Sequence, residues 1–228
     1  MSKYVELGYP IFEGMPVHPV VPQPQLTPKE QIERGDYWNG TIFTIYTHAG
    51  THVDAPWHYC SEGVGIDKIP IENFVYKKPL VINAKCEPNH LISIDELKAA
   101  GEALYEADML LFNTGYYKYR ERDFQTYSTD FPTCSPEAAE FIRKELPKVK
   151  AVAIDSLSIE NIPNGIKDGF KTHNAFLNPV TFPQPTILVY EDYNPEPIIG
   201  KKIISAFATP LRLKDRDGTV INIVAEIE

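Results

Sequence analysis

The stretch from Thr47 to Cys60 reads THAGTHVDAPWHYC and holds three of the six histidines of the chain. A helix is disfavoured here, because Gly50 and Pro56 break helices and the neighbouring Thr and Val are β-branched. In an extended chain, alternate side chains point to opposite faces. The three histidines and the aspartate of this stretch all stand at even positions and therefore share one face: His48, His52, Asp54 and His58.

A straight strand would spread residues 48–58 over about 33 Å, whereas the donor atoms of one metal ion lie about 2 Å from it. We therefore expect the chain to bend at its glycine and its proline. Bent in this way, the stretch predicts a metal ion held by His48, His52 and Asp54, with His58 beside it. Such ligands suit Zn, Mn or Fe and leave positions open, as catalytic sites do. The alternative is that each polar group has its own protein partner at a strand end.

Length and composition place the chain in the globular class. It has 228 residues, of which 43% are apolar and 23% charged, enough to bury a core without disulfide bonds. No repeat, low-complexity tract or linker divides the sequence. We therefore expect residues 1–228 to form one domain, with two small domains divided near Asn113 as the alternative.

Charge and cysteine usage exclude several classes of partner. The 22 Lys and Arg against 31 Asp and Glu give a formal net charge of −9, so nucleic acid is not an expected partner. No window approaches the roughly 18 apolar residues of a membrane span, and no apolar secretion signal begins the chain. Three widely spaced cysteines do not form a disulfide framework. We expect a cytoplasmic protein that acts on a small molecule.

Apolar runs predict an α/β fold that is rich in strands. Seven runs have the length and composition of strands, three of them buried on both faces: residues 41–47, 80–83, 109–113, 151–154, 186–190, 203–207 and 219–227. The Pro-rich segment from Lys3 to roughly Gln31 is expected to run extended and to wrap another part of the domain. Asp217-Gly218 indicates a hairpin turn before the last run.

Helices are expected to be few. A capping box, Ser93 with Glu96, predicts a helix that runs through Leu104. Ser135 followed by Pro136 predicts a second helix, in which apolar residues at four-residue steps form one stripe.

The run from His48 to His58 resembles the HxGTHxDxPxH signature of the cyclase family, which includes bacterial kynurenine formamidases and isatin hydrolases. Four further stretches are similar to other parts of that family's sequence: ELGYPIFEGMPVHP (6–19), LLFNTGYY (110–117), AVAIDSLSIE (151–160) and PLRLKDRDGTVINIVAEI (210–227). The resemblance implies a swivelling β/α/β fold, metal-dependent hydrolysis of an amide or a cyclic amide, and a homo-oligomer, either a dimer or a tetramer.

The resemblance also implies roles for individual residues. His48, His52 and Asp54 would bind the first metal, and His58 would handle protons. His173 and Glu191 would complete a second site that shares the aspartate, giving one or two Zn or Mn ions per chain. Asp192 is a competitor for Glu191, although alternation would send the two to opposite faces. The stretch 178–185, NPVTFPQP, departs from the formamidase pattern, and we expect it to lie beside the site and to set substrate choice.

Several further residues are candidates for contact with the substrate. Four aromatic residues would wall a pocket for a flat aromatic substrate, although aromatic residues beside strands usually lie in the core: Tyr46, Trp57, Tyr59 and Phe176. His18, in a Pro-rich loop, would close over the substrate, with an exposed surface position as the alternative. Ser158 and Asp155 resemble a family motif and are expected to support ligands or shape loops. Cys60 is expected to be a small buried thiol.

Together these observations predict a metal-dependent hydrolase that cleaves a C–N amide bond, most like an arylformamidase acting on an N-formylkynurenine-type substrate. Ring opening of a cyclic amide such as isatin needs the same groups and is the nearest alternative. A non-catalytic, metal-dependent binding protein is the other alternative. His58 favours the enzyme, because hydrolysis needs a proton carrier and binding does not.

Overall fold

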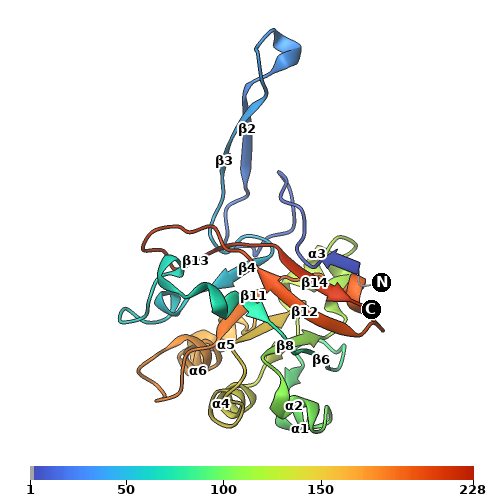
Figure 1. Cartoon of the computed structure of the whole chain (residues 1–228), viewed down its shortest axis with the longest axis vertical. Helices are drawn as coiled ribbons and strands as arrows, with labels where there is room; N and C mark the ends of the chain where they lie inside the picture. The colour runs from blue at the N-terminus through green and yellow to red at the C-terminus, as the bar shows by residue number, and fades with distance from the viewer. Residues whose placement is uncertain (1–2) are drawn as a thin grey trace.

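A computed structural model describes residues 3–228, and its centre is a six-stranded sheet (Figure 1). In spatial order its strands are β13 (Gly218–Val220), β4 (His52–Asp54), β11 (Leu188–Glu191), β10 (Ala151–Ile154), β8 (Met109–Asn113) and β6 (Pro79–Asn83). The last four are parallel to one another, whereas β4 runs antiparallel to both of its neighbours. This places β4, which carries the predicted ligands His52 and Asp54, inside the sheet between its edge strand β13 and β11.

A second, antiparallel sheet and two short ladders complete the strands. The second sheet has the order β1 (Lys3–Glu6), β14 (Ile223–Ile227), β12 (Ile203–Ala208) and β5 (Val75–Tyr76). The ladders pair β7 (Leu91–Ile92) with β9 (Thr133–Cys134), and β2 (Gln25–Glu30) with β3 (Gly40–Thr44).

The helices are short, and the α/β fold class rich in strands is confirmed. The α-helices are α1 (Ile94–Lys98), α2 (Ala103–Glu106), α3 (Phe124–Thr129), α4 (Pro136–Glu145), α5 (Ile162–Asp168) and α6 (Lys171–Leu177). Residues 3–228 also contain six single turns of 3₁₀ helix: η1 (Ile32–Arg34), η2 (Pro56–His58), η3 (Ile66–Lys68), η4 (Ile71–Phe74), η5 (Tyr116–Tyr119) and η6 (Glu196–Ile198). Within residues 3–228, no helix has the length and apolar character needed to cross a membrane.

Capping explains where two of the helices begin. The side chain of Ser135 accepts a hydrogen bond from the backbone N–H of Ala138 at the start of α4, and the predicted capping box of Ser93 and Glu96 opens α1. The helix predicted from Ser93 through Leu104 is wrong in its length. The chain turns at Gly101, whose φ of +66° is strained for other residues, so two short helices form instead.

Two apolar clusters bury both faces of the six-stranded sheet. Met109 and Leu111 of β8 face the second sheet, whereas Leu110 and Phe112 face the helices, and all four are fully buried. On the helical side, Ile142 of α4 belongs to the same cluster as these two residues. The helices therefore lie outside the two sheets and not between them, and the continuous apolar run of β8 follows from burial on both faces.

The last predicted strand, 219–227, is two strands in different sheets. Gly218 begins β13, which pairs with β4, and the chain then crosses to the second sheet as β14. Asp217-Gly218 is therefore not a hairpin turn between neighbouring strands. Glycine is needed here because a Cβ at Gly218 would lie 2.5 Å from the backbone oxygen of Val53.

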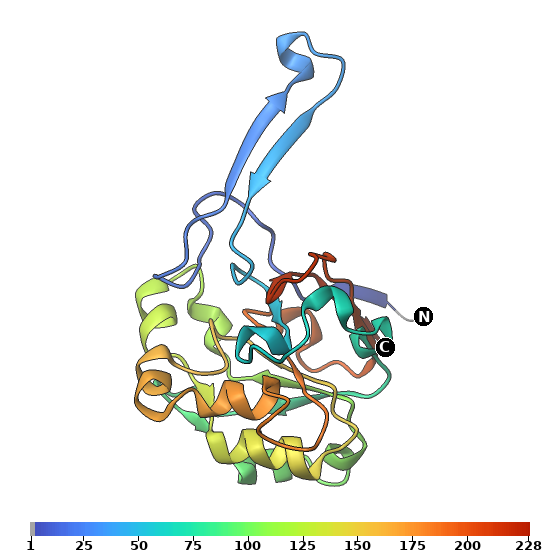
Figure 2. The ribbon, with the colours of Figure 1, turned by 90° about the vertical axis from the view of Figure 1, so that its left-hand side faces the viewer.

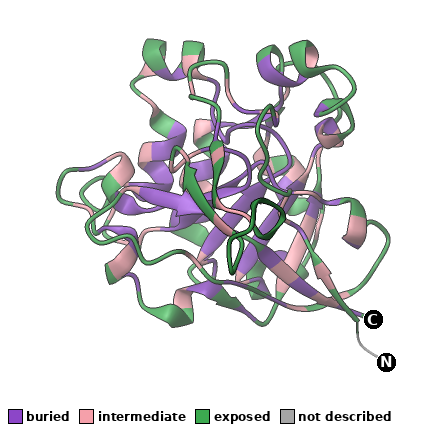
Figure 3. Ribbon diagram, turned by 90° about the horizontal axis from the view of Figure 1, so that it is seen from above, coloured by how far each residue is buried: buried purple, intermediate pink, exposed green. Residues whose placement is uncertain are grey.

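The first part of the Pro-rich N-terminal segment lies on the domain as we expected, because β1 pairs with β14, and Leu7, Met15 and Val17 are buried. The rest of the segment leaves the body. Residues 25–44 instead form a two-stranded arm, β2 paired with β3, which projects from the body and carries η1 near its tip (Figures 1 and 2). Seen end-on in Figure 3, the arm is coloured almost wholly as exposed. Pro28 lies where the ladder register shifts, a position that tolerates a residue without an N–H group.

Candidate metal centre

Strand β4 positions the first pair of predicted ligands. His52 and Asp54 stand two residues apart on this strand and point to the same face. Gly50, with a φ of +66°, bends the chain so that His48 returns to the same place. Pro56 opens η2, which carries His58 over the pair. The bends at Gly50 and Pro56 therefore bring together the three histidines, which a straight strand would hold apart.

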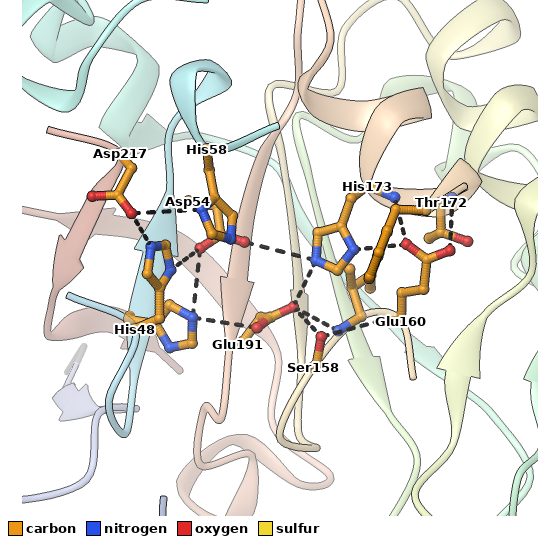
Figure 4. A network of polar contacts seen from close by, with 12 residues as sticks. His48, Asp54, His58, Ser158, Glu160, Thr172, His173, Glu191 and Asp217 are labelled. Carbon is orange, nitrogen blue, oxygen red and sulfur yellow. Dashed lines mark hydrogen bonds and ion pairs between the residues drawn. The ribbon is translucent and has the colours of Figure 1, made fainter. Parts of the chain in front are cut away.

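Two other elements bring the remaining candidates to this place. Glu191 ends β11 and stands opposite His52 in the antiparallel ladder. His173 comes from α6 and lies on the opposite side of Glu191 from His48 (Figure 4). All six residues predicted to bind metal or move protons thus meet at one site: His48, His52, Asp54, His58, His173 and Glu191.

The carboxylate of Asp54 lies at the centre of this group. Its Oδ1 is 2.7 Å from His48 Nδ1 and 3.5 Å from His52 Nε2, and its Oδ2 is 3.9 Å from His173 Nε2. Glu191 lies between two imidazoles, 3.2 Å from His52 and 3.3 Å from His173. Two sets of three ligand atoms lie within 4.8 Å of one another, and both include Asp54: one with His48 and His58, the other with His52 and Glu191.

Two buried atoms at this centre show that the residues fit a cation. His52 Nε2 and Asp54 Oδ2 are buried, and neither has a hydrogen-bond partner among the described residues. His52 Nδ1 lies 2.7 Å from the carbonyl of Gly50 and donates to it, so in the neutral imidazole that a metal ion binds, Nε2 carries the lone pair. A lone pair that faces two carboxylates is repelled unless a positive charge lies between them. Imidazole and carboxylate donors are the ligands that Zn and Mn take, and the donor set therefore fits a divalent ion.

The pKa values at the centre reflect the same excess of negative charge. Burial alone would lower the pKa of His48, but Asp54 and Asp217 outweigh it and raise that pKa to about 10. Burial likewise lowers the pKa of His173, but Glu160 and Glu191 raise it to about 9. Protons thus hold this centre together when no metal is bound, and a metal ion must displace them.

Neighbouring groups fix the orientation of two candidate ligands. His173 Nδ1 donates to Glu160 Oε2 at 2.7 Å, which leaves Nε2 facing the centre. Ser158 Oγ donates to Glu191 Oε1 at 2.8 Å, and the backbone N–H of Ile159 donates to the same oxygen at 2.7 Å. Asp155 lies elsewhere, where it accepts bonds from the backbone of Thr114 and shapes that loop.

Sequence reasoning missed two of the acidic residues at this site. Asp217 lies 2.7 Å from His48 Nε2 and 3.5 Å from His58 Nδ1, so it contacts both histidines. Its signal was the Asp217-Gly218 pair, which we interpreted only as a turn. Glu160 carried a weaker signal, as the acidic residue that ends the stretch AVAIDSLSIE.

A cavity of about 210 Å³ opens beside the centre. His18, Val20 and Tyr46 line it on the side of the N-terminal segment. Tyr59 and Phe170 line it near His173, and the ring of Tyr59 stacks on that imidazole with the centroids 4.3 Å apart. The structure therefore places His18 at the cavity and gives the cavity flat aromatic walls.

Three of the predicted substrate-contact regions do not line this cavity. Phe176 is fully buried in the apolar cluster between the helices and the larger sheet. Trp57 is 42% exposed and does not line the cavity. Residues 178–185 also do not line it, because Arg143 of α4 binds the carbonyls of Asn178 and Gln184 and holds this segment away.

Asp192 and Cys60 lie next to predicted site residues in the sequence, but their side chains point away from the metal centre. Asp192 faces away from Glu191, as alternation predicts, and forms an ion pair with the buried guanidinium of Arg120, in which two N···O distances are 2.8 Å. Cys60 is buried, and its thiol contacts the carboxylate of Glu62 at 3.1 Å. Neither residue therefore belongs to the metal centre.

Known proteins match the chain over most of its length. The family model described as Putative cyclase matches residues 5–161. The kynurenine formamidase of Geobacillus thermodenitrificans is 28% identical over 167 residues, which are 72% of this chain and 75% of that protein. Isatin hydrolase A from Ralstonia solanacearum has a TM-score of 0.82 at 19% identity, with 100% of this chain and 92% of that chain covered. A structure described as a potential metal-dependent hydrolase with cyclase activity has a TM-score of 0.74 at 22% identity, with 100% and 99% covered.

Proposed function

The chain belongs to the cyclase family, and from this membership we propose that it is a metal-dependent hydrolase of C–N amide bonds. The observation that carries the proposal is the pair of unpartnered buried atoms, His52 Nε2 and Asp54 Oδ2, inside a ring of imidazoles and carboxylates. Leaving such atoms without a partner costs about 1–3 kcal/mol each, which a bound cation would recover. A structural role would not require the adjoining open cavity.

We assign the ligands to two halves of the centre that share Asp54. His48 and His52 belong to the first half, and His173 and Glu191 to the second, so that one or two Zn or Mn ions bind per chain. When bound by these residues, a divalent ion would lower the pKa of a water molecule towards neutral and would polarise the carbonyl of the substrate.

His58 is the proton carrier in this proposal. Its side chain is 26% exposed, whereas that of His48, on which it stacks at 4.0 Å between ring centroids, is 8% exposed. Access to the cavity lets it take a proton from water and return it to the leaving nitrogen. Asp217, 3.5 Å from His58 Nδ1, is placed to orient the imidazole, which leaves Nε2 as the nitrogen that exchanges the proton. A binding protein would not need this arrangement.

The cavity walls support a compact aromatic substrate. Tyr46, Tyr59 and Phe170 present flat apolar surfaces beside the centre, and the volume of about 210 Å³ lies below the usual range for ligand pockets. We propose an N-formyl arylamine of the N-formylkynurenine type. A cyclic amide such as isatin is the second candidate, favoured by the isatin hydrolases among the proteins of similar fold.

The test compares kcat/KM for an N-formyl arylamine, for isatin, and for a lactone of similar size. We expect turnover of at least one amide by the metal-loaded protein, loss of turnover after chelation, and recovery after Zn or Mn is added back. Turnover that survives complete removal of metal would overturn the proposal. The ratio between the two amides then decides which substrate class the cavity prefers.

A further inference from the structure

Asp192 has a backbone conformation that residues with a side chain rarely adopt. Its φ is +53°, in the left-handed region. It follows directly after Glu191, which is the last residue of β11 and a candidate metal ligand. Such a conformation persists only where the surrounding structure fixes it. The groups that hold Asp192 therefore also bear on where Glu191 points.

A buried ion pair holds the side chain of Asp192. Arg120 donates from Nε to Oδ1 and from Nη2 to Oδ2, both at 2.8 Å, and the hydroxyl of Tyr127 donates to Oδ1 at 2.6 Å. Arg120 and Asp192 are each 1% exposed. A guanidinium that binds both oxygens of a carboxylate fixes its orientation as well as its position. The side chain of Asp192 is therefore held in one orientation.

The backbone of Asp192 connects the two strands that carry candidate ligands. Its N–H donates to the carbonyl of Ser156 at 2.9 Å, and its own carbonyl accepts a bond from Oγ1 of Thr51 at 2.6 Å. Thr51 is buried and directly precedes His52, which stands opposite Glu191 in the ladder. Asp192 thus follows one candidate ligand and contacts the residue before the other.

Arg120 reaches this turn from a different part of the chain. It follows η5, which comes after β8, and its guanidinium carbon lies 3.8 Å from the centroid of the Tyr9 ring. Apolar residues of similar size often stabilise a fold as well as a buried ion pair does. Stability alone therefore does not explain why a charged pair stands directly behind Glu191.

We propose that Arg120 and Asp192 are positioning residues for the metal centre. The pair holds the left-handed turn at Asp192, and the turn sets the direction of Glu191. The bond from Thr51 carries the same constraint to His52, whose Nε2 lies 3.2 Å from Glu191. The inference rests on the proposed function, because it assigns the pair to that same centre. The pair itself binds neither metal nor substrate.

The test uses Co²⁺ as the probe, because the visible absorption of bound Co²⁺ reports the number and arrangement of its ligands. The first variant combines Arg120→Met with Asp192→Gly. Glycine adopts a left-handed φ without strain, and neither charge of the pair is left behind, so the turn is permitted but no longer held. We expect the affinity for Co²⁺ to fall about 10–100-fold, as it does on loss of groups that orient metal ligands. The absorption of the bound ion should change as well.

The second variant, Arg120→Lys, separates charge from geometry. Lysine keeps the positive charge but loses the fork that binds both carboxylate oxygens. We expect its affinity for Co²⁺ to lie between those of the wild type and the double variant, with the same change in absorption. This variant also decides the question if circular dichroism shows that the double variant does not fold.

The control is Leu104→Ala, at a fully buried position on α2, which lies at the lower end of the body in Figure 1 and away from β4. It should lower the Tm by removing apolar contacts, and it should leave the affinity for Co²⁺ and the absorption unchanged. An equal loss of affinity in this control would overturn the proposal, because lower stability alone would then weaken the centre.

Wild-type affinity and absorption in Arg120→Lys, or in the folded double variant, would also overturn the proposal. The result is separable from the hydrolase function. A wild-type protein that binds Co²⁺ but cleaves no amide would overturn that function and leave the positioning role standing. Active wild type with variants that bind Co²⁺ unchanged would overturn the positioning role alone.

Discussion

Replacing Glu160 with Gln should weaken metal binding without removing any direct ligand. Glu160 is 4% exposed and accepts three hydrogen bonds, from His173 Nδ1 at 2.7 Å and from the backbone N–H groups of His173 and Thr172 at 3.1 and 3.2 Å. Glutamine keeps one acceptor oxygen and turns an NH₂ group towards these donors. At least one buried donor therefore loses its partner, and the imidazole of His173 loses the charged acceptor that orients it.

The size of the effect follows from these contacts. Loss of a group that orients a metal-binding histidine typically lowers metal affinity about 10–100-fold. A buried donor without a partner costs about 1–3 kcal/mol of the free energy of unfolding, and a chain of this size loses about 2–4 °C in Tm for each kcal/mol. We therefore expect the metal-free variant to melt about 2–12 °C below the metal-free wild type.

The assays are a metal titration against a fluorescent chelator and thermal unfolding in excess chelator. The matched control is Glu137→Gln, the same change at an exposed position in the first turn of α4. Its effect should stay within the roughly 0.3–1 kcal/mol of a surface helix-dipole interaction. Wild-type metal affinity in Glu160→Gln would refute the reasoning, because it would mean that His173 does not bind the ion or does not need its orientation fixed.

Three other changes have defined outcomes. The pKa values of His48 and His173 are raised to about 10 and about 9. The stability that their protonation contributes is therefore complete below pH 6.5 and is lost as pH rises through 9 and 10. The Tm of chelator-treated protein should fall from pH 7 to 10, and a rise in Tm would contradict these shifts. His58→Ala should keep its metal but lose roughly 10²–10⁴ in kcat, whereas Asp54→Ala should lose both; metal release by His58→Ala, measured by elemental analysis, would make His58 a ligand. Ile142→Ala, at a fully buried position, should lower the free energy of unfolding by about 2–5 kcal/mol, measured with denaturant. The metal content of the folded protein should not change, and a loss of metal would show that the helical layer also shapes the centre.

The parts of the fold that local sequence determines were predictable. The runs at 109–113 and 151–154 coincide with β8 and β10, because a strand buried on both faces must be apolar at every position. The continuous run at 219–227 could not reveal that β13 and β14 belong to different sheets. An apolar pattern reports burial, and it does not report which layer buries the residue. For the same reason residues 41–47 predicted a strand, but not that it would end at Thr44 and form part of an arm exposed on both faces.

The candidate site also has a part that local sequence predicts and a part that it does not. His48, His52, Asp54 and His58 lie within one short stretch, so their spacing alone indicated a shared centre. Asp217 reaches His48 from 169 positions away, through the pairing of β13 with β4, and no local pattern encodes that contact.

The direction in which a side chain points could not be predicted from the local sequence either. Phe176 and Phe170 flank His173, yet only Phe170 lines the cavity, because rotation along α6 turns Phe176 into the core.

The most direct test of the account is the content of divalent metal per chain, measured by elemental analysis in the same sample whose amide turnover is followed. We predict one to two Zn or Mn ions per active chain, stepwise loss of turnover as chelator removes them, and no bound metal in Asp54→Ala. A preparation that hydrolyses the amide at full rate with no metal bound would contradict the central claim.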